Sequence, residues 1–182
     1  VTYGLEGSIF SAGVAVKWLR DTLQLIKTAD ETETLAKSVA DTGGVYLVPA
    51  FTGLGAPYWD ANARGALLGL TRNSNRAHIV RAALESVAYQ TQDLLQAMTS
   101  DYKGELAILR VDGGMAKNNW LMQFLANILD LEVQRPTCIE TTALGAAYLA
   151  GLQIGLFHSL EDIATRWQMH TAFKPAFESQ IR

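Results

Sequence analysis

The sequence has a single cysteine, Cys138, among its 182 residues. One thiol excludes an intramolecular disulfide, a redox Cys-x-x-Cys pair and any zinc site built from two or more cysteines. No apolar run approaches the roughly 20 residues of a membrane-spanning helix, and the fifteen lysines and arginines are scattered along a chain of net charge -3. Nucleic-acid surfaces need clustered basic residues. We therefore expect a cytoplasmic protein that neither inserts into membranes nor binds nucleic acid.

The chain also lacks a starting methionine, and its first residues show neither the charged nor the apolar region of a signal peptide. With 49% hydrophobic and 18% charged residues, it has the composition of one globular domain with a sizeable core. We interpret residues 1–182 as one domain of a longer protein.

Strand-like and helix-like segments alternate along the sequence, which predicts an α/β layer architecture. Apolar spacing predicts the following order of elements: helix 8–23, helix 28–42, strand 45–48, strand 65–70, helix 76–98, strand 107–111, helix 118–129, strand 131–135 and helix 143–151. No element is predicted from residue 167 onward.

Local details of these helices can also be predicted. Ser8 can cap the first helix, and Thr141 or Thr142 can cap the last one. Glu85 follows Arg81 by one helical turn, which predicts a solvated ion pair. The last helix is rich in small residues, which predicts close packing of its backbone on a sheet: Gly145, Ala146, Ala147 and Ala150.

A glycine-rich loop that contains large aromatic residues lies at Phe51–Asp60 and is followed by Ala63–Gly65. Its alternate glycines permit backbone conformations that other residues avoid, while Pro57 stiffens the middle of the loop. Tyr58 and Trp59 supply amphipathic contact surface. The loop is either a shaped part of a binding site or a buried structural turn.

A second glycine pair follows a predicted strand. Leu109–Val111 leads into Asp112–Gly114, and a helix begins near Asn118. Such a turn can present backbone N–H groups to a bound anion, although Gly-Gly turns also serve purely structural roles. It is not a Walker P-loop, because no Gly-Lys-Ser/Thr follows.

Taken together, four segments resemble the FGGY family of carbohydrate kinases, and within it the glycerol kinases: the loop at 51–65, Leu109–Asn119, Leu5–Gly13, and Gly65–Leu70 followed by His78–Glu85. The resemblance implies an actin-like ATPase (ribonuclease H-like) domain, with a mixed sheet flanked by helices. It identifies residues 1–182 as the C-terminal domain, the nucleotide side of a two-domain enzyme whose N-terminal half lies outside this chain.

The same resemblance implies a nucleotide site. Gly13 and Gly114 match glycines that contact the nucleotide, and Asn118 matches an asparagine close to adenine. Lys17 falls where several members carry glutamine, so it could meet a phosphate or remain a solvated lysine. No catalytic residue and no metal ligand is assigned to this chain, because the catalytic base and the polyol site belong to the N-terminal half. Mg²⁺ is expected to be bound mainly through the phosphates of ATP or ADP.

The implied activity is ATP-dependent phosphorylation of glycerol to glycerol 3-phosphate by the longer protein, expected to be a homo-oligomer. The isolated chain is expected to be inactive. Two alternatives stay open: a kinase for another sugar or polyol such as xylulose, or a nucleotide-binding or oligomerisation module without turnover. The Gly-Leu-Gly-Ala-Pro-Tyr-Trp-Asp run at 53–60 argues against xylulose, because the pentulose kinases carry a charged, differently spaced loop.

Overall fold

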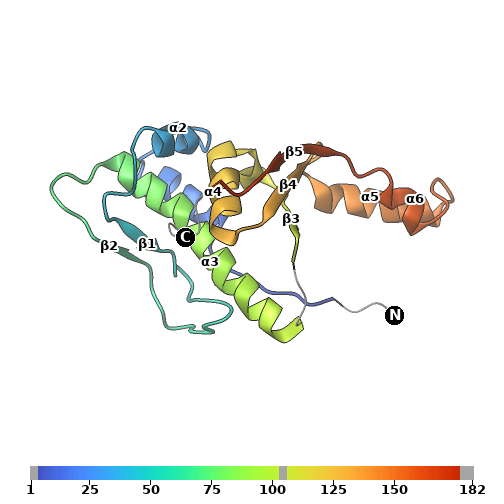
Figure 1. Ribbon diagram of the computed structural model, residues 1–182, viewed down its shortest axis with the longest axis horizontal. Helices are drawn as coiled ribbons and strands as arrows, with labels where there is room; N and C mark the ends of the chain where they lie inside the picture. The colour runs from blue at the N-terminus through green and yellow to red at the C-terminus, as the bar shows by residue number, and fades with distance from the viewer. Residues whose placement is uncertain (1–3, 103–105, 177–182) are drawn as a thin grey trace.

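The computed structural model describes residues 4–102 and 106–176, which form a chain of alternating helices and strands (Figure 1). The elements, in chain order, are α1 (Gly13–Lys17), the π-helical turn η1 (Trp18–Thr22), α2 (Glu31–Lys37), β1 (Tyr46–Val48), β2 (Ala66–Leu68), α3 (Arg76–Tyr102), β3 (Ile108–Arg110), the 3-10 turn η2 (Gly114–Lys117), α4 (Asn119–Leu129), β4 (Glu132–Pro136), α5 (Thr141–Gln153), α6 (Leu160–Ala164) and β5 (Met169–Phe173).

The strands form two separate sheets. β1 and β2 pair antiparallel and frame the glycine-rich loop between them, while β3, β4 and β5 form a sheet in that order. β3 and β4 are parallel, and β4 and β5 are antiparallel, so this second sheet is mixed as expected. The parallel pair requires a crossover connection, which η2 and α4 supply. This crossover places the Gly113–Gly114 turn directly after β3.

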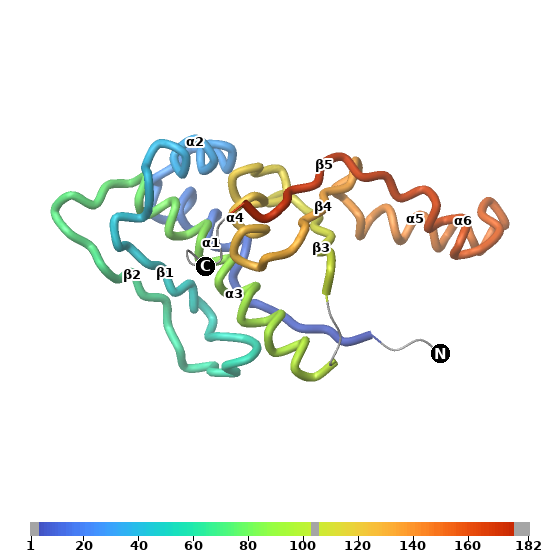
Figure 2. Tube along the Cα trace, viewed as in Figure 1, coloured from blue at the N-terminus to red at the C-terminus, as the bar shows by residue number. Residues whose placement is uncertain are grey.

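The core is built around α3, which packs against α1, α2, α4 and β1 (Figures 1 and 2). Val80, Ala83 and Leu84 recur at helical spacing and are almost completely buried. The apolar face of α4 meets them with Leu121 and Leu125. Although α3 has 27 residues, neither it nor any other helix of the described ranges combines the length and apolar character of a membrane span.

The predicted solvated pair on α3 is wrong, because the pair is buried. The side chains of Arg81 and Glu85 are only 15% and 8% exposed, and Arg81 Nε donates to Glu85 Oε1 at 2.8 Å. Arg81 also donates to the carbonyls of Val39 and Ala40, and Tyr89 donates its hydroxyl hydrogen to Glu85 Oε2. Burial, together with the Glu85 charge, raises the pKa of Tyr89 above its ordinary range.

The first helix begins five residues later than predicted, and Ser8 does not cap it. The residue before α1 is Ala12, which makes no side-chain capping bond. The preceding segment instead runs irregularly against its neighbours: a Cβ at Gly7 would lie 2.5 Å from Leu94, and one at Gly55 would lie 2.5 Å from the Ser8 carbonyl. These close approaches hold residues 7 and 8 in tertiary contact, and the helix begins only at Gly13.

The C-terminal part departs furthest from the predictions. Helix α5 starts at Thr141 after Glu140, so neither threonine is its N-cap. Its small residues do not pack on a sheet among the described residues, since Ala146, Ala147 and Ala150 are exposed. Figure 1 shows α5 and α6 projecting away from the helices around α3. Sequence analysis predicted neither β5 nor α6, whose first turn Ser159 caps by accepting the Asp162 N–H.

The end of the β1–β2 hairpin provides a stability test, because Gly44 and Gly69 face each other there with φ values of +79° and +76°. A Cβ on Gly69 would overlap the carbonyl oxygen of Gly44, whereas a Cβ on Gly44 would meet nothing within 4 Å. We expect Gly44→Ala to cost about 1 kcal/mol from backbone strain alone, and Gly69→Ala to cost roughly 3 kcal/mol. Urea unfolding of the two variants measures the difference, and equal losses would contradict the close approach.

Candidate functional site

A cavity of about 530 Å³ opens between α1 with η1, α2, and the η2–α4 junction. All four residues that sequence analysis assigned to a ligand line it: Gly13, Lys17, Gly114 and Asn118. Gly13 and Lys17 lie about 100 positions before Gly114 and Asn118 in the sequence. The two pairs meet because α1 and α4 both pack against α3. The volume is in the range of small-molecule sites. The apolar part of the lining includes Val16, Leu84, Met115 and Leu121.

Glycines keep the cavity open where α1 faces η2. A Cβ on Gly114 would meet nothing within 4 Å, and one on Gly13 would meet only Met115, at 3.8 Å from its sulfur. Gly113 has φ +77° and ψ 179°, a conformation that L-residues rarely adopt. The turn after β3 therefore brings backbone, without covering side chains, to the edge of the cavity.

Asn118 joins two walls of the cavity. It is the N-cap of α4, because its Oδ1 accepts the Leu121 N–H at 2.9 Å. Its Nδ2 donates to Thr32 Oγ1 of α2 at 3.2 Å. Since a primary amide has two N–H groups, one donor of Asn118 remains for a ligand. The half-buried side chain thus combines a structural role with a position on the cavity lining.

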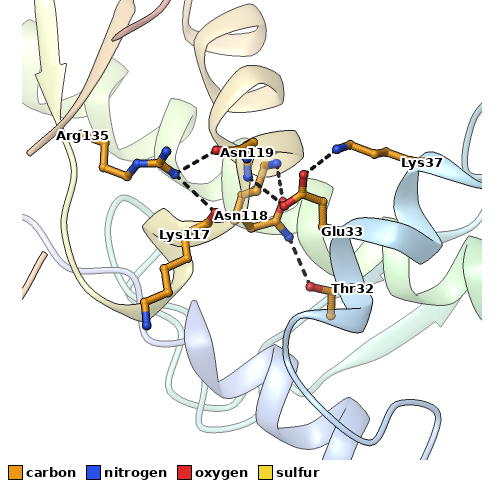
Figure 3. A network of polar contacts seen from close by, with 8 residues as sticks. Thr32, Glu33, Lys37, Lys117, Asn118, Asn119 and Arg135 are labelled. Carbon is orange, nitrogen blue, oxygen red and sulfur yellow. Dashed lines mark hydrogen bonds and ion pairs between the residues drawn. The ribbon is translucent and has the colours of Figure 1, made fainter. Parts of the chain in front are cut away.

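Asn119 strengthens the same junction from the first position of α4. Its backbone N–H donates to Glu33 Oε2 at 3.1 Å, and Glu33 also pairs with Lys37 one turn later in α2. Figure 3 shows Asn118 and Asn119 between Thr32 and Glu33 on one side and Arg135 on the other. A carboxylate at the first N–H groups of a helix is favourable, because those groups carry partial positive charge.

The cavity also gathers cationic side chains from opposite walls. Lys17 lies on α1 and Lys117 ends η2, and both are exposed. In the part of the chain that the structure describes, neither ammonium group has an ion-pair partner. Arg20, also on the lining, is paired with Asp21 through a hydrogen bond that raises the pKa of Arg20 and lowers that of Asp21. Asp30 and Glu33 also line the cavity, so its charge is mixed, and the two unpaired ammonium groups are the part of it that can meet an anionic ligand.

Sequence analysis missed the polar lining residues Arg20, Asp30, Thr32, Glu33 and Lys117. Lys117 lies within the segment that it had already singled out, so the lysine beside Asn118 was an available signal. Thr32 and Glu33 gave no signal, because their place at the cavity depends on the packing of α2 against α3 and α4. In the described ranges, no group of three His, Cys, Asp or Glu side chains is arranged to hold a metal ion.

The glycine-rich loop does not line this cavity. Its first residue, Phe51, packs against Trp18 of η1 with ring centroids 5.0 Å apart. Farther along, the Tyr58 hydroxyl donates to Asp93 Oδ2 of α3 at 2.7 Å, while Trp59 is 69% exposed. Gly53 is needed because a Cβ there would lie 2.7 Å from the Asp60 carbonyl. The loop is shaped and fixed on α3, on surface separate from the cavity.

Comparisons with known proteins bear on what the cavity binds. The model of the FGGY family of carbohydrate kinases, C-terminal domain, matches residues 1–154. The chain is 64% identical over 182 residues to the glycerol kinase of Coxiella burnetii (strain RSA 493 / Nine Mile phase I), covering 100% of this chain and 36% of that protein. It is 63% identical over 175 residues to the glycerol kinase of Desulfitobacterium hafniense, covering 96% and 35%. The chain therefore spans about a third of the length of the curated relatives it matches.

Two solved structures that resemble this chain are also kinases. The crystal structure of Plasmodium falciparum glycerol kinase with ADP has a TM-score of 0.83 and 38% identity to this chain, covering 96% of this chain and 35% of that one. The ligand-bound xylulose kinase from Lactobacillus acidophilus has a TM-score of 0.79 at 26% identity, covering 93% and 35%.

The oxygen and the nitrogen of the Asn118 amide should contribute separately to stability, because Oδ1 caps α4 and Nδ2 bonds to Thr32. Asn118→Ala removes both the N-cap acceptor and the bond to Thr32, and we expect it to lower the free energy of unfolding by about 1–2 kcal/mol. Asn118→Asp keeps the acceptor and loses the donor, so its cost should be roughly half as large. Urea unfolding of the two variants measures this, and an Asp variant as unstable as the Ala variant would count against the capping role.

Proposed function

The chain belongs to the FGGY family of carbohydrate kinases, and from this premise we propose that it is the C-terminal, nucleotide-binding domain of an enzyme that phosphorylates glycerol. Membership confirms the family resemblance and the actin-like ATPase fold class expected from sequence. The proposed reaction transfers the γ-phosphoryl group of ATP to glycerol and yields glycerol 3-phosphate. Relatives named as glycerol kinases, 57–65% identical to this chain, support the choice of substrate.

One observation carries the nucleotide assignment: Gly13, Lys17, Gly114 and Asn118 meet on a single cavity. The cavity has an apolar part to cover a base and unpaired cations that suit phosphates. In the proposed complex, the backbone at Gly13 and Gly114 contacts the nucleotide, and the remaining Asn118 donor lies beside the adenine. Lys17 supplies positive charge toward the phosphates. A structural relative solved with ADP is consistent with this use of the fold.

Phosphoryl transfer depends mainly on positioning and charge neutralisation. Mg²⁺ would be held through the ATP phosphates and would neutralise charge on them. This chain's residues would fix the adenosine end and exclude water from it, while the catalytic base and the polyol site come from the remaining two thirds of the enzyme. For this reason we propose that the chain alone has no kinase activity, and that the complete protein works in the cytoplasm.

An apolar surface on α5 and the turn after it supports a larger assembly. Leu149, Ile154 and Leu156 are 60%, 80% and 66% exposed. Three large apolar side chains along one short stretch are costly to leave in water. We propose that the rest of the enzyme, or a second copy of it in a homo-oligomer, covers this surface.

Substrate choice is tested with the complete protein to which this chain belongs, because the proposed polyol site lies outside the chain. We expect glycerol to be phosphorylated with a kcat/KM about 100-fold above that for xylulose, a discrimination that differential transition-state binding can supply. The unmodified Coxiella burnetii enzyme is the control. Equal turnover of xylulose would favour a broader sugar kinase.

Nucleotide binding by the chain itself is tested in a chimera in which the chain replaces the 182 matching residues of the Coxiella burnetii glycerol kinase. The chimera is titrated calorimetrically with Mg·ADP. The Gly114→Ala variant adds a methyl group where the structure has open space, so it should leave folding intact and weaken ADP binding about tenfold, or 1.4 kcal/mol. Gly4→Ala is the matched control, because a Cβ there also meets nothing within 4 Å and Gly4 does not line the cavity. Unchanged ADP affinity in Gly114→Ala would remove that glycine from the proposed site.

A further inference from the structure

Arg135 of β4 is a buried cation without an anionic partner in the described ranges. The residue is 8% exposed, and no carboxylate lies within 4 Å of its guanidinium there. Burial of an unpaired charge is expensive, because the charge loses its hydration. Such a residue is retained only where other polar groups replace the water. The groups that do so here belong to the η2–α4 junction and to β5.

The guanidinium is satisfied mainly by the η2–α4 junction. Its Nη1 donates to the carbonyl of Ala116 at 2.7 Å, to the carbonyl of Lys117 at 3.3 Å and to Asn119 Oδ1 at 2.9 Å (Figure 3). The last carbonyls of a helical turn have no partner within the turn. Arg135 therefore caps the C-terminal end of η2 and ties it to the first residue of α4.

The opposite side of Arg135 contacts β5. Its Nη2 donates to His170 Nδ1 at 3.3 Å and to Thr171 Oγ1 at 3.4 Å, and the guanidinium carbon lies 5.4 Å from the Phe173 ring centroid. Because arginine has no acceptor, His170 must accept through Nδ1. The strand pair β4–β5 thus holds the planar group in one orientation.

The two ends of η2 have different surroundings. Its C-terminal carbonyls meet Arg135, while its first residue, Gly114, lies on the cavity next to open space. A four-residue turn is too short to hold its own position, and its backbone must stay fixed where a ligand is to contact it.

We propose that Arg135 is a positioning residue for the nucleotide: it fixes η2 from behind, so that Gly114 and Asn118 keep the spacing that the ligand needs. This inference rests on the proposed function, because it assumes that the cavity binds a nucleotide. Arg135 itself does not touch the ligand, since it does not line the cavity. Lysine cannot replace it, because a single ammonium cannot reproduce the planar fork that joins the turn, Asn119 and β5.

The test uses the chimera described above, carrying Arg135→Lys. We expect the KM for ATP and the dissociation constant of Mg·ADP to rise about tenfold, as for other groups that hold binding residues from behind, while the KM for glycerol stays within about twofold. Hydrogen exchange at the amides of Lys117 and Asn118 should accelerate. Arg110→Lys on β3 is the matched control, because this exposed arginine stacks on Trp167 at 4.1 Å and should change none of these quantities.

Unchanged ADP affinity and amide exchange in Arg135→Lys would overturn the inference, as would equal losses toward ATP and glycerol. If the lysine variant does not fold, Asn119→Ala removes one acceptor and keeps the arginine, and it should weaken ADP binding about threefold, the loss of one hydrogen bond. No effect of Asn119→Ala would then count against positioning. A complete protein that binds ADP but does not phosphorylate glycerol would refute the proposed function, while the role of Arg135 would still be decided by the ADP titration.

Discussion

The first turn of α4 is the feature on which the cavity depends. Asn118 caps this helix and reaches Thr32, while the Asn119 N–H meets Glu33, so α2 is attached at two consecutive residues. Helix N-termini leave N–H groups without internal partners, and here neighbouring side chains satisfy two of them. The bonds from this helix start to α2 also fix the angle between α2 and α4. Without that angle, the cavity would lose the wall that α2 supplies.

The sheet holds the same junction from the other side. β3 and β4 are parallel, and the crossover between them begins with the glycine turn and η2. Arg135 lies on β4 and returns to the end of η2, so the strand that closes the crossover also fixes its start. The contact between Arg135 and the end of η2 is both polar and buried. It costs desolvation, but it specifies one position for the turn more strictly than apolar contacts would.

Sequence patterns predicted the elements that are amphipathic or marked by glycine. Helix α3, the individual strands β1 and β2, and the strand, turn and helix between residues 107 and 129 were found because their signals are local. The start of α1 was misplaced because Gly7 and Gly55 allow close tertiary approaches that no local pattern shows. The buried Arg81–Glu85 pair was misjudged for a similar reason: an i, i+4 pair looks the same in sequence whether or not α2 covers it. At the cavity, Thr32 and Glu33 could not be found, because they reach it only through packing.

Helix α5 and the turn after it leave large apolar side chains exposed, in contrast to the core around α3. Around α3, apolar side chains from α1, α4 and β1 bury one another, but α5 is apolar on its outer surface and has little to pack against among the described residues. A helix of this composition gains most of its stability from tertiary contact. Its small residues, which predicted a close neighbour, would be explained if the remainder of the proposed enzyme supplied that neighbour. In that case, the α5 end would become more stable when the two parts of the enzyme meet, because its apolar side chains would then be buried.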